Sequence, residues 1–278
     1  MIYLAYDGSI NSDWVARYAI RLATRATEKK LLLLHVLGGE IPAARLKSKI
    51  EAIGQECRAR QVDFLSESRQ LKRDVFHSLS EMLPAEEQHI CVCGTRVRSR
   101  RKGFLSGTVS AKLLQAHKLP VIAIRVVQPG ILGNARHLLM PLSGHPRKLQ
   151  SALPFFRWLS PDLQGVFLLR VMDVSTSRFH RLSAKQAQAL KVTGRSYLQE
   201  VVADFKREFV PFPFYLDIRV VVSDDWAKEI IIHANKLKAR LILVGASEKT
   251  LPARFIYGNP LEEILRQAPC DVGIYRGL

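Results

Sequence analysis

The chain contains the same run of residues twice at a constant separation, and this repeat limits what the chain can fold into. Each run passes from an apolar strand ending in glycine, through a glycine-led helix start, to a final apolar strand ending in arginine. The matching pairs, each 151 positions apart, are Gly94 and Gly245, Gly107 and Gly258, and Arg125 and Arg276. A register held through a strand, a loop, a helix and another strand indicates a duplicated domain.

The length of the chain agrees with two copies. A chain of 278 residues can form two domains that each bury a core. With 47% hydrophobic and 24% charged residues, the composition is that of an ordinary globular protein. We therefore predict domains over 1–127 and 135–278, joined by a linker over 128–134.

Strand and helix patterns alternate in both halves. The apolar run Leu31–Val36 is typical of a strand buried on both faces of a parallel sheet. The predicted strands cover 2–6, 31–36, 62–66, 89–93 and 121–126, and then 138–142, 166–171, 215–222, 241–244 and 272–275. Strands that alternate with helices imply parallel sheets with right-handed crossovers. We predict an α/β fold of two doubly wound, five-stranded domains.

In such folds, ligands bind beyond the carboxyl ends of the strands, where the strand order reverses. In the first half, Asp7 follows the first strand, Val36 ends the second, and Gly94 follows the fourth. We expect these three residues to converge on one crevice.

Several of these residues carry a family resemblance. They are the Asp7-Gly8-Ser9 turn, the Gly94 to Gly107-Thr108 spacing, and the Pro120-Val121 start of the last strand. Together they resemble the universal stress protein family, specifically its tandem two-domain members, over almost the whole chain. The family pattern is Gly, two residues, Gly, nine residues, Gly, then Ser or Thr, and Val97 stands here at the second glycine. The resemblance implies an adenine nucleotide alpha hydrolase-like fold.

The resemblance also implies where a nucleotide would lie. In nucleotide-binding members, ATP or AMP crosses the strand ends. That arrangement would place adenine near Asp7 and the backbone of Val36, ribose near Gly94, and phosphates on the loop leading to Gly107 and Thr108. Other members bind no nucleotide.

The first copy has the residues that an anion site needs. A glycine-led helix start supplies free backbone N–H groups and positive potential, and Thr108 and Ser110 add hydroxyls. Five cations precede it, at Arg96, Arg98, Arg100, Arg101 and Lys102. The alternatives are that this loop is a solvated surface and that Asp7 only shapes its turn. Val97 also disfavours the positive φ that a glycine there would adopt.

The second copy has the opposite character. Ser143 stands where the first copy has Asp7, and Glu248 stands at the second glycine of the pattern. Asn259 with Glu262 predicts a capping box, and Pro260 removes one N–H donor. We predict that this copy is degenerate and structural.

The sequence offers little catalytic machinery. It has no Gly-x-x-x-x-Gly-Lys-Ser/Thr loop, no paired carboxylates near the predicted crevice, and no nucleophile–base pair at a recognisable spacing. We expect His35 to pack at its strand end, and the four cysteines to be buried core residues that bind no metal. We therefore expect no enzymatic activity.

Two functions remain open. The first is a stress-response regulatory protein that binds ATP or AMP in its N-terminal domain. The second is a nucleotide-free interaction module. Its basic surface, including the helix over 185–206 in a chain of net charge +17, would dock an acidic protein, nucleic acid or membrane. Nucleic acid is the less favoured target, since no aromatic-basic RNA motif or helix-turn-helix pattern is present.

The chain also carries expectations about location and assembly. Its longest apolar run, Lys30–Leu37, is far shorter than the roughly 18 residues of a membrane span. The first predicted strand begins at Ile2, which leaves no room for a cleavable signal peptide. We expect a soluble, cytoplasmic protein with an unidentified protein partner, and a homodimer is left open.

Overall fold

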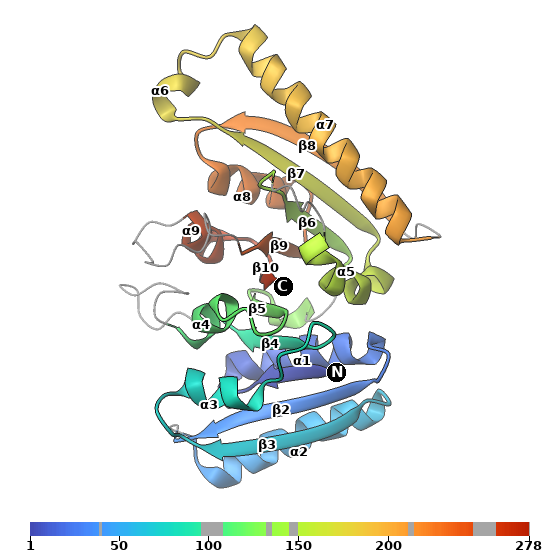
Figure 1. Cartoon of the computed structure of the whole chain (residues 1–278), viewed down its shortest axis with the longest axis vertical. Helices are drawn as coiled ribbons and strands as arrows, with labels where there is room; N and C mark the ends of the chain where they lie inside the picture. The colour runs from blue at the N-terminus through green and yellow to red at the C-terminus, as the bar shows by residue number, and fades with distance from the viewer. Residues whose placement is uncertain are drawn as a thin grey trace. The chain divides into compact units, whose positions relative to one another are not determined.

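The computed structural model describes residues 1–38, 41–95, 108–131, 135–144, 150–210, 214–246 and 260–277. The chain divides into two compact units (Figure 1). The first contains Met1–Gly133, Ala246–Tyr257 and Ile274–Leu278, and the second contains Asn134–Gly245 and Gly258–Gly273.

The first copy of the repeat is a five-stranded parallel sheet with alternating helices. Its elements are β1 (Ile2–Ala5), α1 (Ile10–Arg25), β2 (Lys30–Leu37), α2 (Ala43–Ala59), β3 (Asp63–Gln70), α3 (Val75–Met82), β4 (Ile90–Gly94), α4 (Val109–Gln115) and β5 (Val121–Arg125). The strand order is β3-β2-β1-β4-β5, and each neighbouring pair is parallel. The doubly wound fold predicted for this copy is confirmed.

Local sequence explains the central elements of this copy. The predicted run in β2 is buried apart from the half-buried Leu32, and Leu33 and Leu34 are fully inaccessible. In α1, the apolar residues at helical spacing are also buried, including Val15 and Leu22. Ser9 is the N-cap of α1, and its side chain accepts a hydrogen bond from the backbone N–H of Ser12 at 3.2 Å.

The second copy repeats the order with one addition. Its elements are β6 (His137–Pro141), α5 (Leu153–Leu159), β7 (Gly165–Asp173), α6 (Thr176–Phe179), α7 (Ala184–Glu208), β8 (Tyr215–Ser223), α8 (Trp226–Lys236), β9 (Leu241–Gly245), α9 (Pro260–Gln267) and β10 (Asp271–Arg276). The strand order is β10-β9-β6-β7-β8, and β6 pairs in parallel with both β7 and β9. The short helix α6 was not predicted, because four polar-flanked residues show no periodicity.

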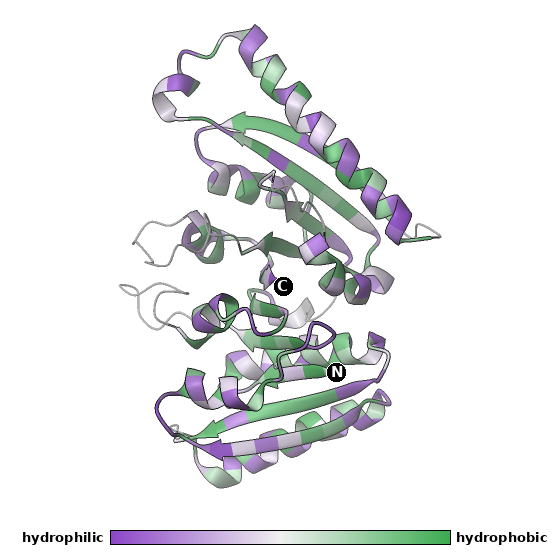
Figure 2. Ribbon diagram, viewed as in Figure 1, coloured by the Kyte–Doolittle hydropathy of each residue, from purple (hydrophilic) through white to green (hydrophobic). Residues whose placement is uncertain are grey.

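Helix α7 packs closely on the sheet of the second copy. A Cβ on Gly194 would lie only 2.6 Å from Val220 Cγ1 of β8, so glycine is needed at this crossing. Further along α7, Phe205 packs edge-on against Phe156 with ring centroids 4.6 Å apart. Both phenylalanines are fully buried. Figure 2 shows β7 and β8 as mainly hydrophobic beneath this helix.

The two copies differ in length mainly at one place. The spacing of 151 positions extends back to Asp74 and Asp225, which cap α3 and α8 by accepting from a backbone N–H. Earlier in each copy, Gly8 and Gly144 occupy matching turns but are only 136 positions apart. The connection from β2 to β3 covers 38–62, whereas that from β7 to β8 covers 174–214. The extra residues of the second copy therefore lie in the connection that contains α6 and α7, and α7 is the longer counterpart of α2.

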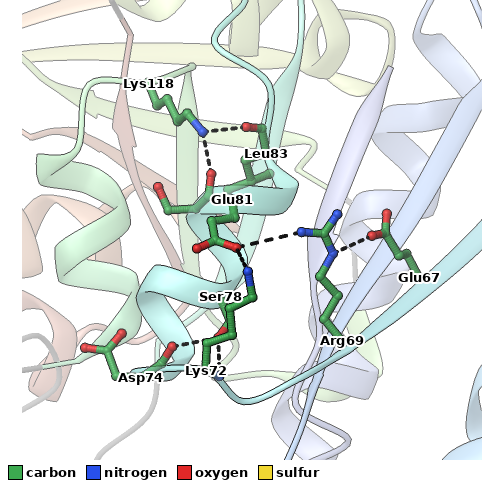
Figure 3. Close-up of polar contacts among 9 residues, drawn as sticks. Glu67, Arg69, Lys72, Asp74, Ser78, Glu81, Leu83 and Lys118 are labelled. Carbon is green, nitrogen blue, oxygen red and sulfur yellow. Dashed lines mark hydrogen bonds and ion pairs between the residues drawn. The ribbon is translucent and has the colours of Figure 1, made fainter.

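The edge strand β3 is bordered by charged side chains (Figure 3). Arg69 Nε pairs with Glu67 Oε1 at 2.9 Å, and Lys72 Nζ pairs with Glu81 Oε2 at 2.6 Å. Nearby, Lys118 Nζ donates to the carbonyl of Leu83 at 2.8 Å, at the end of α3. Exposed pairs of this kind add little stability, but charge at a sheet edge disfavours pairing with another strand.

All four cysteines are buried and free, as the sequence predicts. Burial raises the thiol pKa of Cys57, Cys91 and Cys270 to about 12, so these thiols stay protonated and unreactive. Among the described residues, no group of His, Cys, Asp and Glu could hold a metal ion. Within the same ranges, every helix is too short or too polar to cross a membrane.

Candidate functional site

The candidate site lies where the strand order of the first copy reverses. From β1 the chain moves one way to β2 and β3, and it then returns to the other side of β1 with β4 and β5. The carboxyl ends of β1 and β4 are therefore neighbours from which the connections diverge. In open α/β sheets such a point leaves a crevice that ligands occupy.

Strand register brings the predicted residues to this point. Ala5 is paired with Leu34 of β2 and with Cys93 of β4. Two residues further along each strand lie Asp7, Val36 and Thr95. The structure thus brings Asp7, Val36 and Gly94 together at the carboxyl ends of the strands.

Asp7 shapes the turn after β1. Its Oδ1 accepts a hydrogen bond from the backbone N–H of Ser9 at 2.9 Å, while the residue itself is exposed. The next residue, Gly8, has a φ of +75°, which L side chains rarely adopt. A Cβ on Gly8 would lie 2.8 Å from Ile41 Cδ1, so an apolar side chain covers this turn.

A polar network supports this turn, and it was not predicted from the sequence. Lys49 Nζ of α2 donates to the carbonyl of Gly8 at 2.9 Å and also pairs with Asp13 of α1. Tyr6 donates its hydroxyl to Asp13 Oδ1 at 2.5 Å. Burial and this bond to the carboxylate raise the pKa of Tyr6 far above its ordinary value. In the sequence, Lys49 has only the pattern of a solvated residue on a polar helix.

The end of β4 carries a second close contact. Asn11 Nδ2 donates to the carbonyl of Thr95 at 3.4 Å, and a Cβ on Gly94 would lie 2.5 Å from the same nitrogen. Gly94 therefore allows the Asn11 side chain to lie against the strand end.

Thr95 is a further residue that the sequence did not single out. It is 1% exposed, and its Oγ1 has no hydrogen-bond partner among the described residues. The large majority of buried hydroxyls have a partner, in the protein, in ordered water or in a ligand. Its position beside Gly94 in the repeat was the only signal that could have found it.

The start of α4 is less open than predicted. Thr108 caps the helix by accepting from the backbone N–H of Ala111 at 3.2 Å, and its hydroxyl lies 3.0 Å from that of Ser110. Both hydroxyls are buried. Arg96 and Gly107, with the rest of the predicted basic loop, lie outside the described residues.

Lys112, on the same helix, pairs with Asp74 rather than facing solvent alone. Its Nζ lies 3.0 Å from Asp74 Oδ2. The pKa of Asp74 is held well below its ordinary value, mainly by the hydrogen bond from the backbone N–H of His77, and then by Lys112 and the His77 side chain. The ion pair between Lys112 and Asp74 links α4 to the start of α3, beside the predicted phosphate loop.

His35 has a structural role, as expected. Its Nδ1 lies 2.9 Å from the carbonyl of Tyr6, and the side chain is buried. In the second copy, register places Arg170 at the matching position of β7, since Leu34 pairs with Ala5 and Leu169 pairs with Pro141. Each residue thus reaches from the second strand of its copy to the end of the first.

Arg170 changes the chemistry of the second turn. Its Nη1 donates to the carbonyls of Leu142 and Val171 at 3.2 and 3.1 Å. Gly144 has a φ of +82°, and a Cβ there would lie 2.6 Å from Arg170 Nη2. Burial lowers the pKa of the guanidinium. A cation covers this turn, where the first copy has apolar Ile41.

The substitutions predicted to close the second site are only partly described. Ser143 is exposed, and Glu262 is buried in the first turn of α9. Helix α9 begins at Pro260. Glu248 and Asn259 lie outside the described residues, so the capping box stays a prediction.

Comparison with known proteins agrees with the repeat. The profile of the universal stress protein family matches residues 1–125 and again 157–276, one match to each half of the chain. No curated protein matches the chain in sequence.

Solved structures share the fold over nearly the whole length. A universal stress protein from Archaeoglobus fulgidus is 14% identical, with a TM-score of 0.62 over 99% of this chain and 96% of that one. The cytoplasmic domain of a prokaryotic cation chloride cotransporter is 13% identical, with a TM-score of 0.59 over 99% and 95%. A functionally unknown protein from Pseudomonas aeruginosa is 13% identical, with a TM-score of 0.58 over 98% and 91%. At these identities the likeness concerns the fold alone.

Proposed function

The chain belongs to the universal stress protein family as a tandem member, and from this premise we propose that its N-terminal domain binds an adenine nucleotide, ATP or AMP. The domain spans 1–127, and 135–278 is a second domain of the same kind with a degenerate site. The proposed contacts are Asp7, Val36, Gly94, Arg96, Gly107, Thr108 and Ser110, to which we add Thr95. The role is regulatory, in a stress response, and we assign it no catalytic step.

The observation that carries the proposal is the buried hydroxyl of Thr95. It lies at the switch point of the sheet, next to Gly94, and lacks a partner in the described structure. The matching residue of the second copy, 151 positions on, is Ala246. If a bound ligand supplies the hydrogen-bond partner of the Thr95 hydroxyl, this explains why the first copy has a polar group here and the second has only the methyl group of Ala246.

Two further features support the first copy over the second. Ile41 gives the first turn an apolar cover, and the flat face of a base packs well on apolar surface. At the second turn, Arg170 occupies the matching space and donates hydrogen bonds to backbone carbonyls. A base entering there would first have to displace a half-buried, hydrogen-bonded cation.

Thermal unfolding with and without nucleotide tests the proposal. A ligand that binds only the folded state stabilises it by about 2.7 kcal/mol at a hundredfold excess over Kd. Millimolar ATP or AMP should therefore raise the melting temperature by several degrees over a buffer control. The absence of a shift with both nucleotides would contradict nucleotide binding.

Thr95→Val separates a ligand contact from a purely structural residue. The substitution keeps the shape and removes the unpartnered hydroxyl, so the ligand-free protein should melt at the same temperature or higher. The nucleotide shift should shrink. Thr193→Val, an exposed position on α7, is the matched control and should change neither quantity.

Two further variants test the choice of copy. Arg96→Ala should reduce the shift by removing a cation from the predicted phosphate loop. Asn259→Ala should leave it unchanged. The reverse pattern would place the nucleotide in the C-terminal domain.

A nucleotide-free interaction module is the second candidate. The observation that favours it is the basic connection from β7 to β8, where the short α6 and the 25-residue α7 take the place of the 17-residue α2 of the first copy. Under this alternative, no adenine nucleotide shifts the melting temperature.

A further inference from the structure

The free edge of β8 has backbone groups without strand partners. β8 lies at the end of the strand order, and among the described residues it pairs only with β7. The N–H of Tyr215 donates to Gln164, and the carbonyl of Ser223 accepts from Val174, so the odd-numbered residues of β8 bond to β7. In a parallel ladder the alternate residues point the other way. Leu216, Ile218, Val220 and Val222 therefore direct their N–H and C=O groups to the open edge.

A groove with a basic wall runs beside this edge. It has a volume of about 230 Å³ and is lined by Gln188, Lys191, Val192 and Arg195 of α7 together with Val220 of β8. Lys191 and Arg195 are one helical turn apart, both are exposed, and neither has an ion pair among the described residues. The groove thus combines strand-pairing groups with two available cations.

The segment around the groove has unusual charge. Between Asp173 and Glu200 there is no acidic residue, while the cations are Arg178, Arg181, Lys185, Lys191 and Arg195. This segment lies in the longer connection of the second copy, and Figure 1 shows α7 running along β8. The basic wall therefore belongs to the crossover helix that takes the place of α2 in the second copy.

We propose that the edge of β8 binds an extended acidic segment of a partner protein, which adds to the sheet as a further strand. Main-chain hydrogen bonds to the even-numbered residues of β8 would hold the segment, and its carboxylates would pair with Lys191 and Arg195. Strand addition gives affinity through the backbone and specificity through alternate side chains. This surface is separate from the proposed nucleotide site.

The charges decide between this occupant and a second copy of the chain. Two β8 strands paired edge to edge about a twofold axis would keep both α7 helices on the same face of the joined sheet. The pairs Lys191 and Arg195 of the two copies would then face each other. Like charges placed together oppose pairing, whereas carboxylates are attracted.

The outward N–H and C=O groups of β8 favour a peptide backbone over a phosphate polymer. A strand edge offers alternating donors and acceptors, and a peptide backbone satisfies both. Nucleic acid phosphates and lipid headgroups accept hydrogen bonds but donate few. They would leave the outward carbonyls of β8 bonded to water alone.

The test uses the full chain and a fluorescent octapeptide of alternating glutamate and valine. We expect saturable binding by fluorescence anisotropy at low salt, and no binding of the matching lysine–valine peptide. Lys191→Gln with Arg195→Gln should weaken binding about tenfold, since two charge pairs are lost. Lys228→Gln with Lys236→Gln removes the same charge from exposed positions on α8 and should leave binding unchanged.

A second test of strand addition changes the peptide and leaves the protein unaltered. Only one of the two alternate sets of peptide N–H groups faces β8. N-methylation of that set should abolish binding, and N-methylation of the other set should have little effect. Equal effects of the two sets would overturn strand addition.

Other outcomes would also overturn the proposal. One is failure of the acidic peptide to bind, and another is equal binding by both charge variants. Heparin, or vesicles of anionic lipid, that bind through Lys191 and Arg195 and displace the peptide at equal charge would reassign the surface to polyanions or membranes. A dimer of the free chain that the peptide dissociates would make the occupant a second copy.

Discussion

The turns after β1 and β6 have the same backbone but different covers. Gly8 and Gly144 both have positive φ, at +75° and +82°. Over Gly8 lies the apolar side chain of Ile41, and over Gly144 lies the guanidinium of Arg170. Duplication has kept the backbone geometry, while the chemistry above it comes from side chains on neighbouring elements. A shared motif therefore does not imply a shared ligand.

The same contrast recurs deeper in the two copies. At a spacing of 151 positions, Thr95 corresponds to Ala246 and Met82 corresponds to His233. Met82 and His233 are equally buried, each 8% exposed. One copy thus buries an inert thioether where the other buries a group that titrates. Such exchanges leave the fold unchanged and alter what each domain responds to.

The largest expected effect is at the first turn. Gly8→Ala places a Cβ at positive φ and 2.8 Å from Ile41 Cδ1, and we expect a loss of about 2–3 kcal/mol in the free energy of unfolding. Urea denaturation followed by circular dichroism measures it. Gly130→Ala is the matched control, because nothing lies within 4 Å of a Cβ there and its φ is not positive. A loss below about 0.5 kcal/mol for Gly8→Ala would show that this turn is not constrained.

Much of the fold could be predicted, because strand burial leaves a local pattern. The run Leu31–Val36 lies within β2, and the predicted strand over 272–275 lies within β10. Register then follows from parallel pairing, so the convergence of Asp7, Val36 and Gly94 could be predicted as well.

The rest of the site could not be predicted, for a physical reason. The contacts of Lys49 with Gly8, of Asn11 with Gly94, and of Arg170 with Gly144 join side chains to the backbone of distant elements. They depend on rotamers and on packing between elements, which no spacing along the chain records. The helix α6 also escaped prediction, since a single turn has no period.

A medium effect is expected at the second turn. Arg170→Ala leaves the carbonyls of Leu142 and Val171 without their donor, and it removes the guanidinium from beside the Tyr197 ring, 5.9 Å from its centroid. We expect a loss of about 1–2 kcal/mol in the free energy of unfolding. Arg170→Lys keeps a charge but not the planar donors, and it should recover only part of the loss. Full recovery by lysine would mean that charge alone matters at this turn.

The Arg170→Ala variant also tests whether Arg170 accounts for the difference between the two turns. If Arg170 is what excludes a base from the second copy, Arg170→Ala should allow a nucleotide-dependent rise in melting temperature that survives Thr95→Val. If Ala246 and Ser143 also matter, no such rise appears. We expect no rise, because the second copy lacks the hydroxyl and the carboxylate of the first at this edge.

The smallest effect concerns pH and the exchange of Met82 for His233. Burial is the main cause that lowers the pKa of His233 below its ordinary value of 6.5, and Arg219 and Lys236 lower it further, while Glu229 acts in the opposite direction. The folded state therefore binds a proton less readily than the unfolded state. Stability contributed by the neutral imidazole is complete above 6.5 and is lost as the pH falls from there toward the lowered pKa.

Replacing His233 by the residue of the first copy should remove this dependence. His233→Met should flatten the fall in the free energy of unfolding below pH 6.5, and it should cost little at neutral pH because a thioether fits the same kind of site in α3. His180→Met changes an exposed histidine and should leave the pH profile as it was. Urea denaturation at a series of pH values compares the three proteins. A slope that persists in His233→Met would assign the acid sensitivity to other groups and leave the two buried positions equivalent.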